Sequence, residues 1–174
     1  MLKMDDCTMD EILILGLGNV LQSDDGVGVR VVERMQERYW FSDNVRILDG
    51  GTRGMALAPS LRGVARLLVV DALESERGPG ALTRWAGEEV LSFLANRVLP
   101  HQDGLTELLS AARLLGVFPK KVVLLGVAPA VLDTGMELSP SVSVRVDELV
   151  DMVLRELRRW DVKAHPKKSR CSAI

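Results

Sequence analysis

The chain has 174 residues, with 22 lysines and arginines against 24 aspartates and glutamates, 47% hydrophobic residues and a formal net charge of −2. This length suits one globular domain, and the apolar fraction excludes an intrinsically disordered chain. Because the net charge is near zero, no overall field would draw the protein onto nucleic acid or an anionic membrane, and we expect neither kind of partner.

The two cysteines indicate where the protein works. Cys7 and Cys171 lie near opposite ends of the chain, and neither has a second Cys or His at metal-ligand spacing. Neither a disulfide framework nor a zinc site is indicated, so we expect a reducing, cytoplasmic location. The longest apolar stretch, residues 122–132, is too short to span a bilayer, and the first ten residues are too acidic for a secretory signal.

Apolar runs with the spacing of strands alternate with runs that have helical spacing. The first strand is predicted to end in the tight turn Gly16-Leu17-Gly18-Asn19, and the helix after it begins near Gly28. We expect strands at residues 12–17, 45–48, 67–70, 81–85 (an edge strand) and 121–127, and helices at 28–39, 55–61, 88–94, 105–115 and 142–160. Such alternation predicts an α/β fold, a single-domain twisted and mostly parallel sheet with helices on both faces.

The domain boundary is expected at the end of the last predicted helix. Residues 1–160 would form the single α/β domain. Residues 161–174 would form a basic, flexible C-terminal tail, because chain ends are usually poorly ordered.

Ligands of open α/β sheets gather beyond the carboxyl ends of the strands. Carboxylates cluster at such positions here, since Asp24 and Asp25 follow the first predicted strand and Asp71 follows the third. An unpaired buried carboxylate is very costly, so these groups must be solvated, hydrogen-bonded or bound to a cation. His101, in a polar loop, could add a nitrogen to two carboxylates and make an open site for a divalent transition metal. The aspartates could instead cap helices or turns, and the histidine could be a surface residue.

The glycine-rich turn after the first strand is also typical of a dinucleotide-binding site. Gly16 and Gly18 are present, but Leu21 stands where the G-x-G-x-x-G fingerprint has its third glycine. Asp24 and Asp25 would repel a pyrophosphate at the start of the helix. Both observations argue against a dinucleotide site, and a nucleotide-binding α/β enzyme is kept only as an alternative interpretation.

Four blocks of sequence resemble a known family. They are ILGLGNVL with DDGVG (residues 14–21 and 24–28), DGGTRG (49–54), LVVDA (68–72) and PHQDGL (100–105). Their order and spacing closely resemble those of the nickel-iron hydrogenase maturation endopeptidases, over residues 12–159. The fold of that family is likewise a twisted α/β sheet.

The resemblance implies a function and a partner. Members of that family remove a short C-terminal extension from the large-subunit precursor of a [NiFe] hydrogenase after nickel has been inserted. The expected partner is that precursor, and the expected metal is the precursor's own nickel. No tightly bound cofactor of the enzyme is expected, and cadmium or another divalent metal could substitute for nickel. A metal-sensing chaperone that binds the large subunit without cutting it is a second alternative.

The resemblance also implies roles for individual residues. The family's metal ligands fall on Asp25, Asp71 and His101, which we expect to act both in metal binding and in catalysis. The first of these is Glu in some relatives and Asp in others. Asp49, Gly50, Gly51 and Thr52 are expected to form a supporting loop beside them.

Overall fold

The structure is a computed structural model that describes residues 10–96 and 104–167. Strands and helices alternate through both described parts, and the first described element is strand β1. In chain order the elements are β1 (Glu11–Leu17), η1 (Ser23–Gly26), α1 (Val27–Arg38), β2 (Tyr39–Trp40), β3 (Val45–Gly51), η2 (Gly54–Leu61), β4 (Val64–Ala72), β5 (Leu82–Ala86), α2 (Glu88–Ala95), α3 (Gly104–Leu114), β6 (Lys121–Val127), α4 (Pro140–Ser143), α5 (Val146–Arg159) and β7 (His165–Pro166).

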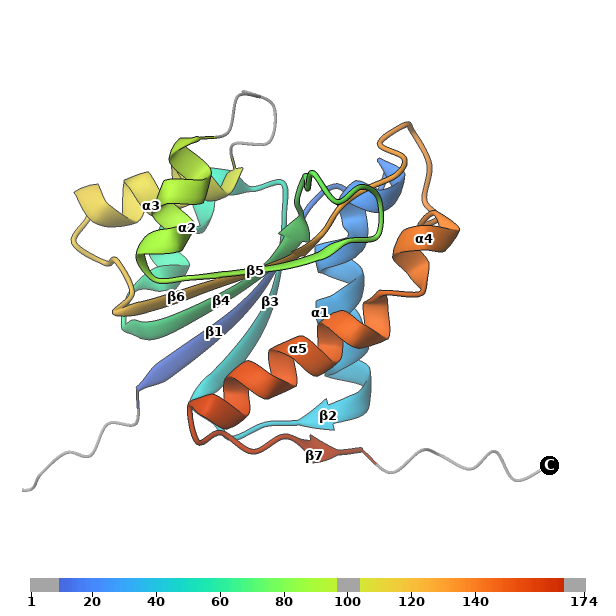
Figure 1. Ribbon diagram of the computed structural model, residues 1–174. Helices are drawn as coiled ribbons and strands as arrows, with labels where there is room; N and C mark the ends of the chain where they lie inside the picture. Colours follow the sequence, from blue (N-terminus) through green and yellow to red (C-terminus); the bar gives the residue numbers. More distant parts are fainter. Residues whose placement is uncertain (1–9, 97–103, 168–174) are drawn as a thin grey trace, which may run out of the picture.

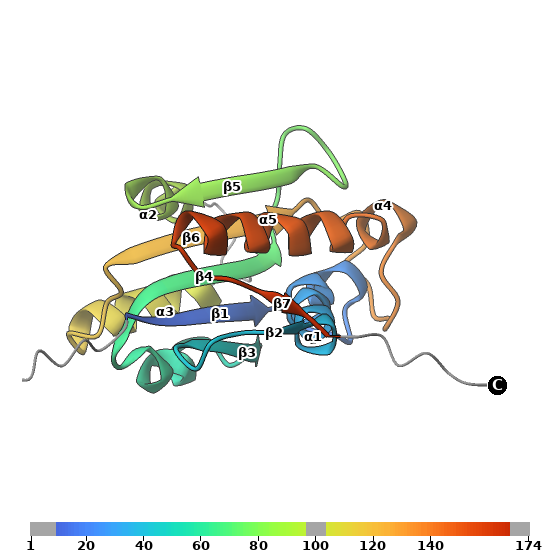
Figure 2. The same ribbon diagram turned by 90° about the horizontal axis from the view of Figure 1, so that it is seen from below.

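The main sheet has five strands in the order β3-β1-β4-β6-β5. The first four run parallel, and β5 pairs antiparallel with β6 at one edge. Figures 1 and 2 show the twist of this sheet and the helices packed against it. The predicted α/β class, with a mostly parallel sheet, is confirmed.

Alternate side chains of the strands point to opposite faces of the sheet and build two cores. Ile12 and Ile14 of β1 pack with α1, α4 and α5 on one face. Leu13 and Leu15 pack with η2, α2 and α3 on the other face. Figure 1 shows the same division, with α1 and α5 on the side of the sheet opposite α2 and α3. Both faces are covered, as expected for a parallel sheet.

Several predicted boundaries are wrong. The strand predicted at 45–48 continues to Gly51, because its pairing with β1 includes Asp49 and Gly51, so three of the four residues expected in a supporting loop belong to β3. Strand β4 does not end before Asp71, because its pairing with β6 continues through Asp71↔Gly126 and Ala72↔Val127. The predicted helix at 142–160 is two helices, α4 and α5, with Val144 and Arg145 between them. There the N–H of Arg145 donates to the carbonyl of Val142, three residues earlier. The backbone thus makes a turn tighter than that of an α-helix.

The chain beyond α5 contains a strand that was not predicted. Strand β7 pairs antiparallel with β2, through Tyr39↔Pro166 and Trp40↔His165. The N–H of Lys167 then bonds to the carbonyl of Arg38 at the end of α1. The first half of the expected tail thus lies along the domain, as Figure 2 shows for β2 and β7.

Within these described parts, no helix is long and apolar enough to cross a membrane.

Candidate functional site

A pocket of about 380 Å³ opens at the carboxyl ends of the parallel strands. Its walls come from the end of β1, from η1, from the end of β3, from β4 and from the start of α3. The described residues that line it are Leu17, Gly18, Gln22, Asp25, Gly51, Thr52, Gly54, Asp71, Gly104, Leu105 and Leu132.

The topology explains why the pocket lies there. From β1 the chain crosses through α1 to β3 on one side, whereas β4 lies on the other side of β1. At such a reversal in strand order, the loops that follow the two neighbouring strands run apart. A crevice forms between these loops. The pocket contains the ends of β1 and β4, the two strands at this reversal.

Asp25 is held at the pocket by the turn that follows β1. Its Oδ2 atom accepts a hydrogen bond of 2.7 Å from the N–H of Asn19, and the side chain is half-buried. Gly18 makes this arrangement possible, because it has φ of 119° and an added Cβ would lie 1.7 Å from the carbonyl oxygen of Asp25. Only glycine fits such a conformation and such a close approach. This packing gives Gly18 a role that needs no phosphate ligand.

Asp71 enters the same pocket from β4. It is 9% exposed, and its Oδ1 atom accepts a 2.8 Å hydrogen bond from the N–H of Ala72. Helix α1 starts close behind it, since an added Cβ at Gly28 would lie 2.2 Å from the carbonyl oxygen of Val70. The sheet and α1 therefore fix the backbone on which Asp71 stands.

The end of β3 and the residue after it contribute backbone and a hydroxyl to the pocket rather than a carboxylate. Gly51 and Thr52 line the pocket, and the carbonyl of Gly51 accepts a 3.1 Å hydrogen bond from the N–H of Gly18. Asp49 is exposed, and neither it nor Gly50 is among the lining residues. Arg53 braces the turn, because its guanidinium donates to the carbonyls of Asp49 and Gly50.

His101 lies outside the described residues. Gly104 and Leu105, which follow it closely in the sequence, line the pocket where α3 begins. Residues 10–96 and 104–167 contain no group of three His, Cys, Asp or Glu side chains that could hold a metal ion. The structure thus brings two of the three predicted ligands, Asp25 and Asp71, to one pocket.

Asp24, the neighbour of Asp25, is fully buried and holds a second loop against the site. Its carboxylate accepts hydrogen bonds from the N–H groups of Ala130, Val131 and Ser139 and from the Ser139 hydroxyl, at 2.7–2.9 Å. Burial alone would raise the pKa of Asp24, but these hydrogen bonds outweigh it and lower the pKa. Residues 129–139, including the pocket residue Leu132, are positioned in this way.

Sequence reasoning placed residues 129–135 at a strand end but did not identify the individual residues that line the pocket. Gln22 and Leu132 line the pocket, yet an isolated glutamine or leucine in a loop carries no pattern that identifies it. Asp24 could have been recognised only through its long-range partners, which lie more than 100 positions away in the chain.

The geometry allows a limited set of reactions. Two carboxylates in one small pocket can share a divalent cation, or they can hold a water molecule and accept its proton. No third described titratable group lines the pocket. The pair of carboxylates suits a hydrolase.

Comparison with known proteins identifies a protease family. The family described as hydrogenase maturation protease matches residues 29–156. The hydrogenase 2 maturation protease of Escherichia coli (strain K12) is 41% identical over 159 residues, which are 91% of this chain and 97% of that protein. The hydrogenase expression/formation protein HupD of Rhodobacter capsulatus is 39% identical over 156 residues, covering 88% of this chain and 74% of that protein.

Solved structures agree. The hydrogenase maturating endopeptidase HybD from Escherichia coli superposes with a TM-score of 0.84 at 41% identity, over 90% of this chain and 98% of that one. The [NiFe] hydrogenase maturation protease HybD from Thermococcus kodakarensis gives 0.71 at 28% identity, over 84% and 98%. This chain therefore belongs to the hydrogenase maturation protease family, and it is an endopeptidase of hydrogenase maturation.

Proposed function

We propose that this endopeptidase removes a short C-terminal extension from the nickel-loaded large-subunit precursor of a [NiFe] hydrogenase, at the pocket that contains Asp25 and Asp71. The observation that carries the proposal is that Asp25 and Asp71, 46 positions apart in the sequence, line one pocket at the reversal between β1 and β4. The family supplies the reaction type.

His101 is the proposed third group. It stands three positions before Gly104 in the sequence, so covalent geometry keeps the Cα atoms of the two residues within about 11 Å. Gly104 lines the pocket. A histidine side chain within that reach would complete a set of two oxygens and one nitrogen.

In the proposed mechanism the nickel belongs to the substrate. The precursor presents its nickel, already held by its own thiolates, and the three side chains occupy positions that those ligands leave open. A precursor without nickel would lack this contact and bind weakly. Docking through the metal also places the scissile bond in a fixed position beside the carboxylates.

Peptide cleavage then proceeds by attack of water. A water molecule polarised by the metal or by a carboxylate adds to the scissile carbonyl, and its proton passes to a carboxylate and then to the leaving amine. We infer that the reaction takes place in the cytoplasm, because the two widely separated cysteines of the sequence give no disulfide framework.

The test is precursor processing by three single variants. Asp25→Asn, Asp71→Asn and His101→Ala should each reduce cleavage of nickel-loaded precursor by at least about a hundredfold, as for loss of a group acting on the reacting atoms. The mass of the precursor before and after incubation reports cleavage. This readout also separates an endopeptidase from a chaperone that only binds.

Asp133→Asn is the matched control, because Asp133 is an exposed carboxylate of the neighbouring loop that does not line the pocket. It should process precursor at the wild-type rate. Circular dichroism should show that all four variants are folded. Full processing by any two of the three site variants would refute the assignment.

A further inference from the structure

A second and larger groove, of about 1200 Å³, lies beside the candidate active pocket. Its walls are the loop after β4, helix α2 and the loop after β6. Leu132 lines both the groove and the pocket, so the two hollows share a wall. A peptide with its scissile bond at Asp25 and Asp71 could therefore continue past Leu132 into the groove.

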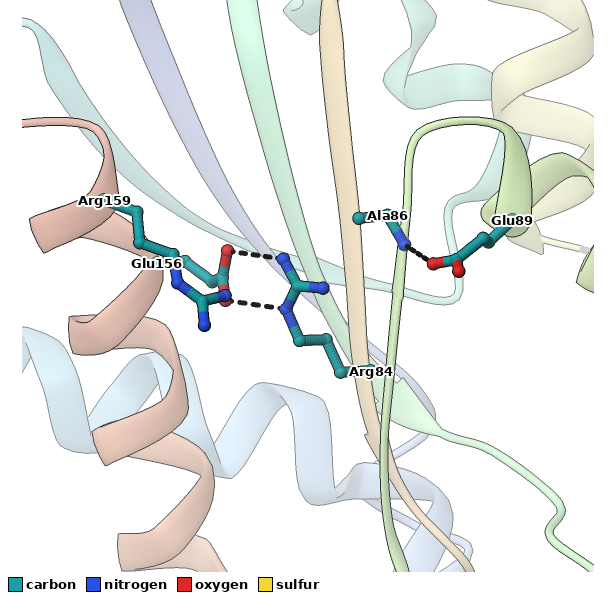
Figure 3. A network of polar contacts seen from close by, with 5 residues as sticks. All are labelled: Arg84, Ala86, Glu89, Glu156 and Arg159. Atoms are coloured by element: carbon teal, nitrogen blue, oxygen red, sulfur yellow. Dashed lines mark hydrogen bonds and ion pairs between the residues drawn. The ribbon is translucent and has the colours of Figure 1, made fainter.

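The rim of the groove is acidic. Four glutamates line it, and no lysine or arginine is among its described lining residues. These glutamates are Glu74, Glu76, Glu88 and Glu89, all exposed. Glu89 also accepts a hydrogen bond of 3.2 Å from the N–H of Ala86, which Figure 3 shows, so its carboxylate is tied to the end of β5. Several carboxylates around one hollow give a negative potential that favours a cationic ligand.

The groove is also partly apolar, and it contains an aromatic pair. Trp85 of β5 stacks on Phe93 of α2, with ring centroids 5.0 Å apart and planes 17° from parallel. Pro79, Pro129 and Leu132 add apolar surface. Such a lining holds aliphatic side chains, and aromatic faces also attract ammonium and guanidinium groups.

We propose that this groove binds a segment of the large-subunit precursor that adjoins the scissile bond and carries both basic and apolar side chains. The proposal rests on the proposed function, because it takes the precursor as the substrate. The acidic rim selects the charge of the segment, the aromatic pair contacts its apolar side chains, and the shared wall at Leu132 sets its distance from the cleaved bond. The groove thus contributes substrate affinity outside the metal contact.

The test combines charge reversal with steady-state kinetics. The variant E74K/E76K changes two exposed residues of the loop after β4. With nickel-loaded large-subunit precursor, it should raise KM on the order of tenfold and leave kcat within about twofold, since exposed ion pairs contribute modestly to binding. Added salt should raise the KM of the wild type more than that of the variant, because screening acts on the charges that the variant lacks.

E37K/D43K is the matched control. It makes the same change in net charge at two exposed residues, in α1 and in the turn before β3, that do not line the groove. Its KM should equal that of the wild type. An equal KM for E74K/E76K and this control, or a fall in kcat alone, would overturn the proposal.

A second measurement does not depend on cleavage. A short fluorescein-labelled peptide of alternating leucine and lysine should bind the wild type more tightly than the corresponding leucine–glutamate peptide, and E74K/E76K should lose that preference. Absence of any preference in the wild type would overturn the groove proposal even if the precursor is cut normally. If the wild type prefers the lysine peptide but does not cut precursor, the proposed function fails and the groove's cationic selectivity stands.

Discussion

Two adjacent aspartates, Asp24 and Asp25, have very different surroundings. Asp25 is half-buried at the pocket, with one hydrogen bond from the N–H of Asn19. Asp24 is fully buried and accepts four hydrogen bonds from the loop at 129–139. One carboxylate thus belongs to a residue that lines the pocket, and the next fixes a wall of that pocket.

Replacing Asp24 should therefore affect stability strongly. In Asp24→Ala, three N–H groups lose their acceptor inside the protein and the Ser139 hydroxyl keeps only that of Ser141 as a partner. We expect the free energy of unfolding to fall by about 2–4 kcal/mol. Urea denaturation followed by circular dichroism measures this change. Asp133→Ala, on the same loop but exposed, should stay within about 0.5 kcal/mol of the wild type. A loss of less than 0.5 kcal/mol for Asp24→Ala would show that the loop is held by other contacts.

Helix α5 and the edge strand β5 are joined by an ion pair between a buried glutamate and a partly exposed arginine. Glu156 of α5 is 3% exposed, and its two oxygens accept hydrogen bonds of 2.8 and 3.0 Å from the guanidinium of Arg84 in β5. Arg159, one turn further along α5, also donates to Glu156. Figure 3 shows the two arginines on either side of the carboxylate. Burial would raise the pKa of Glu156, but Arg84 and Arg159 together lower it.

This ion pair predicts a pH dependence of stability. The folded pKa of Glu156 lies below the unfolded value of about 4.3, so its contribution is present above that pH and is lost as the pH falls through the folded value. Glu156→Gln should lower the free energy of unfolding by about 1–2 kcal/mol near neutral pH. This loss is smaller than for a fully buried ion pair, because Arg84 is partly exposed. The difference from the wild type should shrink between about pH 5 and pH 3.

Urea midpoints measured across that range provide the check. Glu37→Gln, at an exposed glutamate of α1, is the control and should follow the wild type at every pH. A Glu156→Gln deficit that stays constant down to pH 3 would mean that the charge of Glu156 does not contribute.

The central strands β1, β4 and β6 were predictable because their apolar runs are buried on both faces. The run at 121–127 was placed without error, and β5 was correctly predicted as an edge strand. The end of β4 was misplaced because a carboxylate normally marks the end of a buried strand. Asp71 stays in the strand because backbone pairing with β6 continues and its side chain accepts the N–H of Ala72. Strand β7 has two residues, too few to show a period.

At the level of the whole chain, the sequence predicted the fold class and two residues that meet at the pocket. Asp25 and Asp71 were selected because each follows a predicted parallel strand, and the strand order then placed those strands side by side. The shape of the pocket could not be predicted. It depends on Asp24 reaching across to Ser139, a contact that only the folded chain creates. The shape of the groove beside it could not be predicted either, because its walls come from two loops and a helix, which are separate in the sequence.

Metal binding by the intact protein is the decisive observation for the proposed site. In crystals soaked with cadmium or nickel, anomalous density should appear at the pocket, with the ion within coordination distance of carboxylate oxygens of both Asp25 and Asp71 and of a ring nitrogen of His101. Asp71→Asn crystals treated in the same way should show much weaker density. An ion bound elsewhere while the pocket stays empty, or an ion that contacts only one of the three side chains, would contradict the three-ligand site.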